Sequence, residues 1–321
     1  MSQTGLQGTT IPHERDVVLT IGTFDGVHLG HRHLVQQVVR RSRERGYLSG
    51  AVTCHPHPRA VVTGDGPPYL MCLDDRLAQL RGLGLDIVAA LPFTQDLAQL
   101  SALEFMSRLC ESVCLRELWV GAGFALGRRR EGTIARLTEI GRELGFQVHA
   151  LPPLLFCGRR VSSSLIREIV GQGRVETAAW LLARRHHVSG IAVRGDQREH
   201  HLGLPTIAVV ISAGLALPVG GVYVARVQSG ARQWSATVRV EPHRAGTPRR
   251  LQASMPDFPD GLVGQLLQVE FVRRLRAGMP VQAVRSPMDE APARAEAAAG
   301  LYPSQIIRPH QHHCLETGLV G

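Results

Sequence analysis

Residues 17–31 read VVLTIGTFDGVHLGH. Their first part, Val17 to Ile21, is an apolar and β-branched run that predicts an inner strand of a parallel sheet. Three glycines follow, which let the backbone turn sharply, and a basic helix is expected from about His33 to Arg45. A helix that begins directly after a strand favours anions, because its first amides are unpaired and its dipole is positive at that end. The stretch therefore predicts an anion site.

His28 and His31 lie three residues apart at the start of this helix, so their imidazoles are expected on one face beside the same anion. For an arbitrary pair of histidines, a surface position and a helix-start position are the commoner explanation. The surrounding Gly-Thr-Phe-Asp-Gly sequence favours the functional interpretation, in which both rings serve a phosphate group during transfer.

Composition bounds the class of protein. With 321 residues, 44% hydrophobic residues and a mean hydropathy near zero, we expect a globular protein with two cores. No apolar run reaches the length of a membrane span, and residues 1–15 carry no apolar signal core, so we expect a cytoplasmic protein without a membrane partner. The oligomeric state stays open.

The net charge of +9 admits nucleic acid or anionic small molecules as partners. The basic residues are scattered in short clusters, and aromatic residues make up only 5%, so stacking platforms for nucleic acid are scarce. We therefore expect small polyphosphate substrates and no nucleic acid.

The order of elements predicts two domains. Short apolar strands alternate with helical segments up to about residue 182, which favours an α/β domain with a parallel sheet and ligands at the carboxyl ends of its strands. From Val188 to about Phe271 the strands are short and separated by Gly and Pro turns, which indicates a compact β-barrel. The predicted strands of the sheet are residues 17–21, 50–53, 87–91, 117–120 and 147–150. The predicted division is a disordered arm at 1–15, domains at 16–185 and 186–299, and a tail at 300–321.

Three segments resemble one family. Residues 22–31 are similar to the HxGH signature of the nucleotidyltransferase superfamily, in the version found in bacterial bifunctional riboflavin kinase/FAD synthetases. Residues 53–58 (TCHPHP) resemble the family's Thr-Phe-x-Pro-His-Pro segment, and residues 162–167 (SSSLIR) resemble its Ser-Ser-Thr-x-Ile-Arg motif. Taken alone, the serines would indicate an ordinary capped helix.

The resemblance implies a Rossmann-like nucleotidyltransferase domain followed by a riboflavin-kinase-like barrel. The implied activity is transfer of AMP from ATP to FMN, which yields FAD and pyrophosphate, with Mg²⁺ held by the ATP phosphates. The catalytic residues implied are His28, His31 and Arg167. The ATP-binding residues implied are Gly22, Thr23, Phe24, Asp25, Gly30, Ser162, Ser163 and Ser164, and the flavin or acceptor residues are Pro56, His57, Pro58 and Gly123.

Two departures in the first half concern the acceptor. Gly123 stands where relatives have an aspartate or asparagine, and Leu126 replaces their second aromatic residue. A glycine supplies no side-chain hydrogen bond, so these positions bear on which acceptor is used.

The barrel half departs further from the family. Ala208 follows Thr206 and Ile207 where the family has an asparagine near its metal–phosphate site, Gln252 stands in place of a catalytic glutamate, and Glu199 replaces a glycine. Each change removes a ligand, a base or a loop geometry that phosphoryl transfer needs. We therefore expect riboflavin kinase activity to be lost.

Two alternatives remain open. The protein is then either a nucleotidyltransferase with a different phosphorylated acceptor, or a regulator without catalysis that binds a nucleotide or flavin. Residues 280–299 are expected to be helical in part. The tail carries His310, His312, His313 and Cys314, which suit weak metal binding or a disordered segment.

Overall fold

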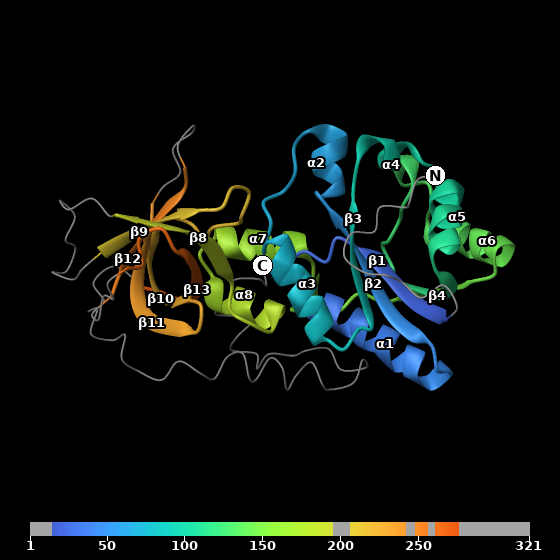
Figure 1. Cartoon of the computed structure of the whole chain (residues 1–321), viewed down its shortest axis with the longest axis horizontal. Helices are drawn as coiled ribbons and strands as arrows, with labels where there is room; N and C mark the ends of the chain where they lie inside the picture. The colour runs from blue at the N-terminus through green and yellow to red at the C-terminus, as the bar shows by residue number, and fades with distance from the viewer. Residues whose placement is uncertain (1–14, 195–205, 242–247, 256–260, 276–321) are drawn as a thin grey trace. The chain divides into compact units, whose positions relative to one another are not determined.

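The structure is a computed structural model that describes residues 15–194, 206–241, 248–255 and 261–275. Its contacts divide the chain into two compact units (Figure 1), each treated by itself here. The first comprises Met1–Pro67 and Cys72–Leu155, and the second comprises Pro68–Met71 and Phe156–Gly321. The predicted division near Arg185 stays a prediction. The tail with its histidines, residues 280–299 and most of the N-terminal arm lie outside the described residues.

The first unit contains the predicted parallel sheet. Five strands lie in the order β3-β2-β1-β4-β5, and all neighbouring pairs are parallel. The strands are β1 (Asp16–Gly22), β2 (Leu48–His55), β3 (Ile87–Pro92), β4 (Cys114–Gly121) and β5 (Gln147–Leu151). The α/β interpretation is thus confirmed. Because β1 pairs with β2 on one side and β4 on the other, the strand order reverses at the carboxyl end of β1, where ligands bind in such sheets.

Helices connect the strands of this sheet. They are α1 (Leu29–Arg45), α2 (Pro58–Thr63), α3 (Leu73–Gly82), α4 (Gln95–Gln99), α5 (Ala102–Ser112), the 3₁₀ turn η1 (Arg128–Arg130) and α6 (Ile134–Leu144). Helix α1 begins at Leu29 rather than near His33, because His28 caps it. Among the described helices, none is long and apolar enough to cross a membrane.

The two faces of β1 serve two different layers. Val17, Leu19 and Ile21 share one apolar cluster with Met106 of α5 and Ile140 of α6. The alternate residues face the other way, since side chains along a strand alternate between faces. Figure 1 shows α1 and α3 along one side of the sheet and α5 and α6 along the other. Both faces of β1 are therefore covered, which explains why apolar residues occupy successive positions from Val17 to Leu19.

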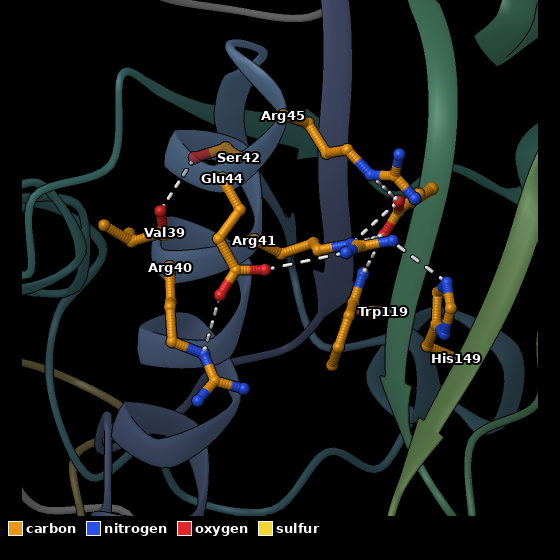
Figure 2. Close-up of polar contacts among 9 residues, drawn as sticks. Val39, Arg40, Arg41, Ser42, Glu44, Arg45, Trp119 and His149 are labelled. Atoms are coloured by element: carbon orange, nitrogen blue, oxygen red, sulfur yellow. Dashed lines mark hydrogen bonds and ion pairs between the residues drawn. The ribbon is translucent and has the colours of Figure 1, made fainter.

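A buried carboxylate fixes α1 against β4. Glu117, with 5% of its side chain exposed, accepts hydrogen bonds from Arg41 Nε at 2.9 and 3.0 Å and from Trp119 Nε1 at 2.9 Å. His149 Nε2 lies 3.4 Å from the same carboxylate, and Figure 2 shows Arg41, Trp119 and His149 converging on one place. Burial acts to raise the pKa of Glu117, but the hydrogen bonds from Arg41 and Trp119 outweigh it and hold the pKa below its usual value. The contacts couple α1 to the sheet.

The second unit contains the predicted barrel. Its strands close in the order β10-β11-β12-β9-β8-β13, with antiparallel neighbours throughout. They are β8 (His187–Arg194), β9 (Thr206–Ile211), β10 (Gly221–Ser229), β11 (Arg232–Val240), β12 (Arg250–Ser254) and β13 (Leu266–Arg274). Helices α7 (Ser163–Gly171) and α8 (Val175–Leu182) and the short pair β6 (Leu155–Phe156) and β7 (Arg159–Arg160) precede them. The predicted compact barrel is confirmed.

A short strap from the first half of the sequence, Pro68–Met71, belongs to the second unit. Within it, Tyr69 pairs in parallel with Leu215, and its N–H donates to the carbonyl of Gly214 at 2.6 Å. The N–H of Ala216 donates to the carbonyl of Tyr69 at 2.7 Å. The strap thus forms backbone hydrogen bonds in both directions with the segment that follows β9.

Candidate active site

The turn between β1 and α1 adopts an unusual backbone. Phe24 and Val27 have positive φ angles of 45° and 41°, which bulky residues rarely adopt, and Gly26 has a φ of 83°. The N–H of Val27 donates to the carbonyl of Phe24 at 3.0 Å and closes the turn. The ring of Phe24 packs so close to Gly22 that a Cβ there would lie 3.3 Å from it. Gly26 therefore allows the turn, and Gly22 allows the close packing of the Phe24 ring.

His28 is the N-cap of α1. Its ring Nδ1 accepts the backbone N–H of His31 at 3.3 Å, a bond that a protonated Nδ1 could not make. The neutral ring then carries its proton on Nε2, so Nε2 is the atom that donates. No acidic residue lies in the first turn of α1, and the positive end of the helix dipole there favours an anion.

The rings of His28 and His31 lie against one another. Their centroids are 3.6 Å apart with planes inclined by 15°, and Phe24 meets His31 edge-on at 5.2 Å. His28 is only 5% exposed, and Asp25 of the same turn is fully buried. The structure therefore brings the two predicted catalytic histidines together at one helix terminus, beside a buried carboxylate.

The predicted acceptor segment follows β2, directly beside β1. His57 caps α2, with Nδ1 accepting the N–H of Arg59 at 3.1 Å, and Pro58 is the first residue of that helix. The peptide bond between His55 and Pro56 is cis. Burial, with a smaller contribution from the charge of Arg76, holds the pKa of His55 below its usual value. His55 is thus favoured in its neutral form.

The loop after β4 contains the departures from the family pattern. Gly123 is exposed, and its carbonyl accepts a hydrogen bond from Arg130 Nη2 at 3.3 Å. Leu126 instead packs against the apolar core of the first unit and pairs with Gly132. Gly123, which lacks the expected carboxylate or amide side chain, therefore has the Arg130 guanidinium beside it. The sequence analysis had not singled out Arg130 as a site residue.

The serine-rich motif forms the start of α7 in the second unit. Ser162 is the N-cap and accepts the N–H of Leu165 on its Oγ at 3.2 Å, which places Ser163 and Ser164 in the first turn. Arg167 Nε donates to the carbonyl of Pro68 in the strap at 2.7 Å. The motif thus has the capped-helix geometry expected of it.

The predicted nucleotide residues are distributed over both units. His28 and His31 lie in the first unit, and Ser163, Ser164 and Arg167 lie in the second. That the two groups act on one nucleotide stays a prediction, as do the roles of Thr23 and Gly30.

The barrel brings two predicted kinase positions together. Ala208 of β9 and Gln252 of β12 are direct cross-strand partners, and Thr206 Oγ1 lies 3.1 Å from Ser254 Oγ. Gln252 Nε2 donates to Glu241 Oε1 at 2.9 Å. Ala208 and Gln252 are thus neighbours in the barrel. The family pattern has an asparagine at the first of these positions and a glutamate at the second. Glu199 lies outside the described residues.

Arg76 on α3 was also missed by the sequence analysis. Its side chain is 1% exposed, and Nη2 lies 3.8 Å from Asp25 Oδ1 in the turn described above. Arginine on a surface helix is usually solvated, so no sequence signal marked its burial.

Two family models match the chain. The FAD synthetase family matches residues 10–165, and the riboflavin kinase family matches residues 182–286. The first match covers the strands of the parallel sheet, and the second covers the strands of the barrel.

Similar proteins match this chain over most of its length. The bifunctional riboflavin kinase/FMN adenylyltransferase of Pseudomonas fluorescens is 34% identical over 269 residues, which cover 83% of this chain and 86% of that protein. The Escherichia coli K12 protein of the same name is 30% identical over 277 residues, covering 85% and 88%. A solved structure named Macrolide-efflux Protein, from Streptococcus pneumoniae, has a TM-score of 0.75 and 23% identity over 85% of this chain and 91% of that one. That likeness shows the fold alone.

Proposed function

Because this chain belongs to the family of bifunctional riboflavin kinase/FMN adenylyltransferases, we propose that it transfers AMP from ATP to FMN and forms FAD and pyrophosphate. The observation that carries this proposal is the β1–α1 turn, in which His28 and His31 stack at the N-terminus of a helix whose first turn holds no acidic residue. Donors at that end of a helix suit a phosphate that gains negative charge during transfer.

The reaction needs little proton chemistry. A phosphate oxygen of FMN attacks the α-phosphorus of ATP, the new P–O bond forms, and the bond to the bridging oxygen breaks as pyrophosphate leaves. The attacking oxygen is already anionic, so no strong general base is required. The protein must instead orient the two anions and stabilise charge in the transition state.

The roles of the residues follow from their donor atoms. His28 would donate from Nε2 to the α-phosphate, with His31 and the first amides of α1 around it. Ser163, Ser164 and Arg167 would receive the β- and γ-phosphates, because hydroxyls, helix amides and a guanidinium suit the departing pyrophosphate. ATP would enter as its Mg²⁺ complex, with the cation bound mainly to substrate phosphates, as Mg²⁺ prefers.

We further propose that the barrel no longer phosphorylates riboflavin. Ala208 offers no side-chain oxygen to a metal, and the Gln252 amide is too weak a base to take a proton from a hydroxyl group. The pairing of these two residues across β9 and β12 supports this proposal, since both losses fall at one place in the barrel.

The test is an incubation of the purified protein with Mg²⁺-ATP and either riboflavin or FMN, followed by chromatographic separation of the flavins. We expect FAD from FMN, and neither FMN nor FAD from riboflavin. The His28→Ala variant is the control for a contaminating host enzyme. Formation of FMN from riboflavin would contradict the loss of kinase activity, and absence of FAD from FMN would contradict the transferase proposal.

A second candidate function is favoured by Gly123. With no side chain at this position and Arg130 beside it, the loop after β4 would accept a phosphorylated acceptor other than FMN. Release of pyrophosphate from ATP in the presence of a different phosphate monoester, with none in the presence of FMN, would support this alternative. ATP or flavin binding without turnover of any acceptor would instead support a regulator.

A further inference from the structure

A buried ion pair joins the β1–α1 turn to helix α3. Asp25 and Arg76 each have 1% of their side chains exposed, and Asp25 Oδ1 lies 3.8 Å from Arg76 Nη2. Burying a carboxylate and a guanidinium costs a large desolvation free energy. The attraction between the two charges offsets this cost only when they are held close together. A pair of this kind fixes the relative positions of the two elements that carry it.

Arg76 also contacts the carboxyl end of β2. Its Nη1 donates to Thr53 Oγ1 and to the carbonyl of Cys54, each at 3.4 Å. Thr53 Oγ1 in turn donates to the carbonyl of Thr23 at 2.9 Å. The Arg76 guanidinium is therefore connected to the turn in two ways. It pairs directly with Asp25, and it bonds to Thr53, which in turn bonds to Thr23.

The backbone of the turn is strained. Phe24, Gly26 and Val27 all have positive φ angles, so the backbone on both sides of Asp25 is in a conformation that most residues disfavour. Tertiary contacts must hold such a segment in place. Asp25 lies three positions before His28, whose ring caps α1 and stacks on His31.

We propose that Arg76 is a positioning residue for nucleotidyl transfer: it holds Asp25 and Thr53, and thereby sets where the His28 ring meets the α-phosphate. Arg76 itself contacts no substrate in this role. The inference rests on the proposed function, and it names a residue of α3 that acts through the turn.

The charge of Arg76 extends to the neighbouring loop. It contributes, after burial, to lowering the pKa of His55, and it opposes the burial that raises the pKa of the Cys54 thiol to about 11. Loss of the guanidinium would therefore change the electrostatics at the ends of β1 and β2 together.

The experiment compares four variants with the wild-type full chain: Arg76→Met, a double variant, Arg76→Lys and a control. Arg76→Met removes the charge and leaves Asp25 buried, which endangers folding. The double variant Asp25→Asn, Arg76→Met removes both charges, and such replacements leave stability nearly unchanged in many proteins. Arg81→Met is the matched control, because it removes an exposed arginine from the same helix.

We expect the folded double variant to lose about 10- to 100-fold in kcat for FAD formation, because an error of about 1 Å in a reacting group costs up to about 100-fold. The KM for ATP should rise by a smaller factor than kcat falls, since Asp25 is the only implied ATP-binding residue altered and the donors for the β- and γ-phosphates are elsewhere. Arg76→Lys, which keeps the charge opposite Asp25, should recover most of the loss. Arg81→Met should behave as wild type.

A second readout does not depend on turnover. The imidazole C–H resonances of His28 and His31 should shift in the double variant and stay in place in Arg81→Met. A double variant with wild-type kcat and unchanged resonances would overturn the proposal. If the wild-type protein forms no FAD while the double variant still shifts these resonances, the proposed function fails and the positioning of the turn by Arg76 stands.

Discussion

His28 accepts the backbone N–H of His31 on Nδ1 at 3.3 Å while the rings of the two residues stack at 3.6 Å. One imidazole therefore both starts helix α1 and keeps its proton on Nε2. These two roles can be separated by substitution, because asparagine is a good N-cap but has no ring.

His28→Asn and His28→Ala should both lower kcat for FAD formation about 100-fold, since loss of one donor to a developing charge typically costs about 3 kcal/mol. They should differ in stability, with Ala about 1 kcal/mol less stable than Asn because it cannot cap the helix. Steady-state kinetics and urea unfolding measure the two effects. Near-normal turnover in either variant would contradict the catalytic role of the ring.

Arg167→Ala should lower turnover by about 100-fold, by the same reasoning on charge stabilisation. It should also lower the free energy of unfolding by about 1 kcal/mol, because the hydrogen bond to the carbonyl of Pro68 is lost. Arg159→Ala is the control, since this exposed arginine pairs with Glu168 on the same helix. Equal turnover in the two variants would remove Arg167 from the site.

Glu117→Gln should destabilise the first unit by about 2 kcal/mol at pH 7, since hydrogen bonds to a charged group are lost in a buried place. The pKa of Glu117 is lowered in the folded state, so its contribution is present above the usual pKa of 4.5 and is lost as the pH falls below it. The difference between wild type and variant should therefore stay constant from pH 7 to about pH 5 and shrink as the pH falls below 4.5, as measured by chemical unfolding. Glu44→Gln, on the exposed side of Arg41, should stay within about 0.5 kcal/mol of wild type.

Acid should weaken the barrel through His186. This side chain is fully buried, its Nε2 donates to the carbonyl of Ala216 at 2.8 Å, and burial lowers its pKa to about 3. The unfolded chain binds a proton below about pH 6.5 and the folded chain does not, so stability falls from pH 6.5 downward. Between pH 7 and pH 5 this linkage amounts to about 2 kcal/mol. His186→Gln should flatten the profile, and an equally steep profile in that variant would assign the effect to another group.

Gly123→Asn should lower the KM for FMN about fivefold if FMN is the acceptor, because a new amide hydrogen bond is worth about 1 kcal/mol. Gly123 is exposed, so the melting temperature should hardly change. Initial rates at varied FMN concentration measure the effect. An unchanged KM would show that this loop does not contact the flavin phosphate.

The sheet was predictable because its strands carry their own signal. Val17 to Ile21 is apolar apart from Thr20 and Ile87 to Leu91 is apolar throughout, as expected of strands covered on both faces, and each run falls within an observed strand. The start of α1 was predicted too late, because an imidazole cap lacks the Ser, Thr, Asp or Asn that marks most helix starts.

The candidate site was predictable only where a short motif carries it. The positions of His28, His31 and Ser162 follow from contiguous sequence. The burial of Arg76 and the bond between Arg41 and Glu117 depend on residues far along the chain, 76 positions apart in the second case. Each resembles an ordinary solvated arginine until the tertiary structure places a carboxylate opposite it.

The strap Pro68–Met71 bears on how far the two activities of this family can be separated by genetic means. A chain that ends after residue 185 would retain Tyr69 but lose Leu215 and Gly214, its hydrogen-bonding partners. A fragment that starts at residue 156 would retain the barrel but lack Tyr69, so the backbone groups of Gly214 and Ala216 that bond to Tyr69 would be exposed to water. The halves are therefore interleaved along the sequence, and swapping one of them between relatives would require carrying this four-residue segment with the barrel that receives it.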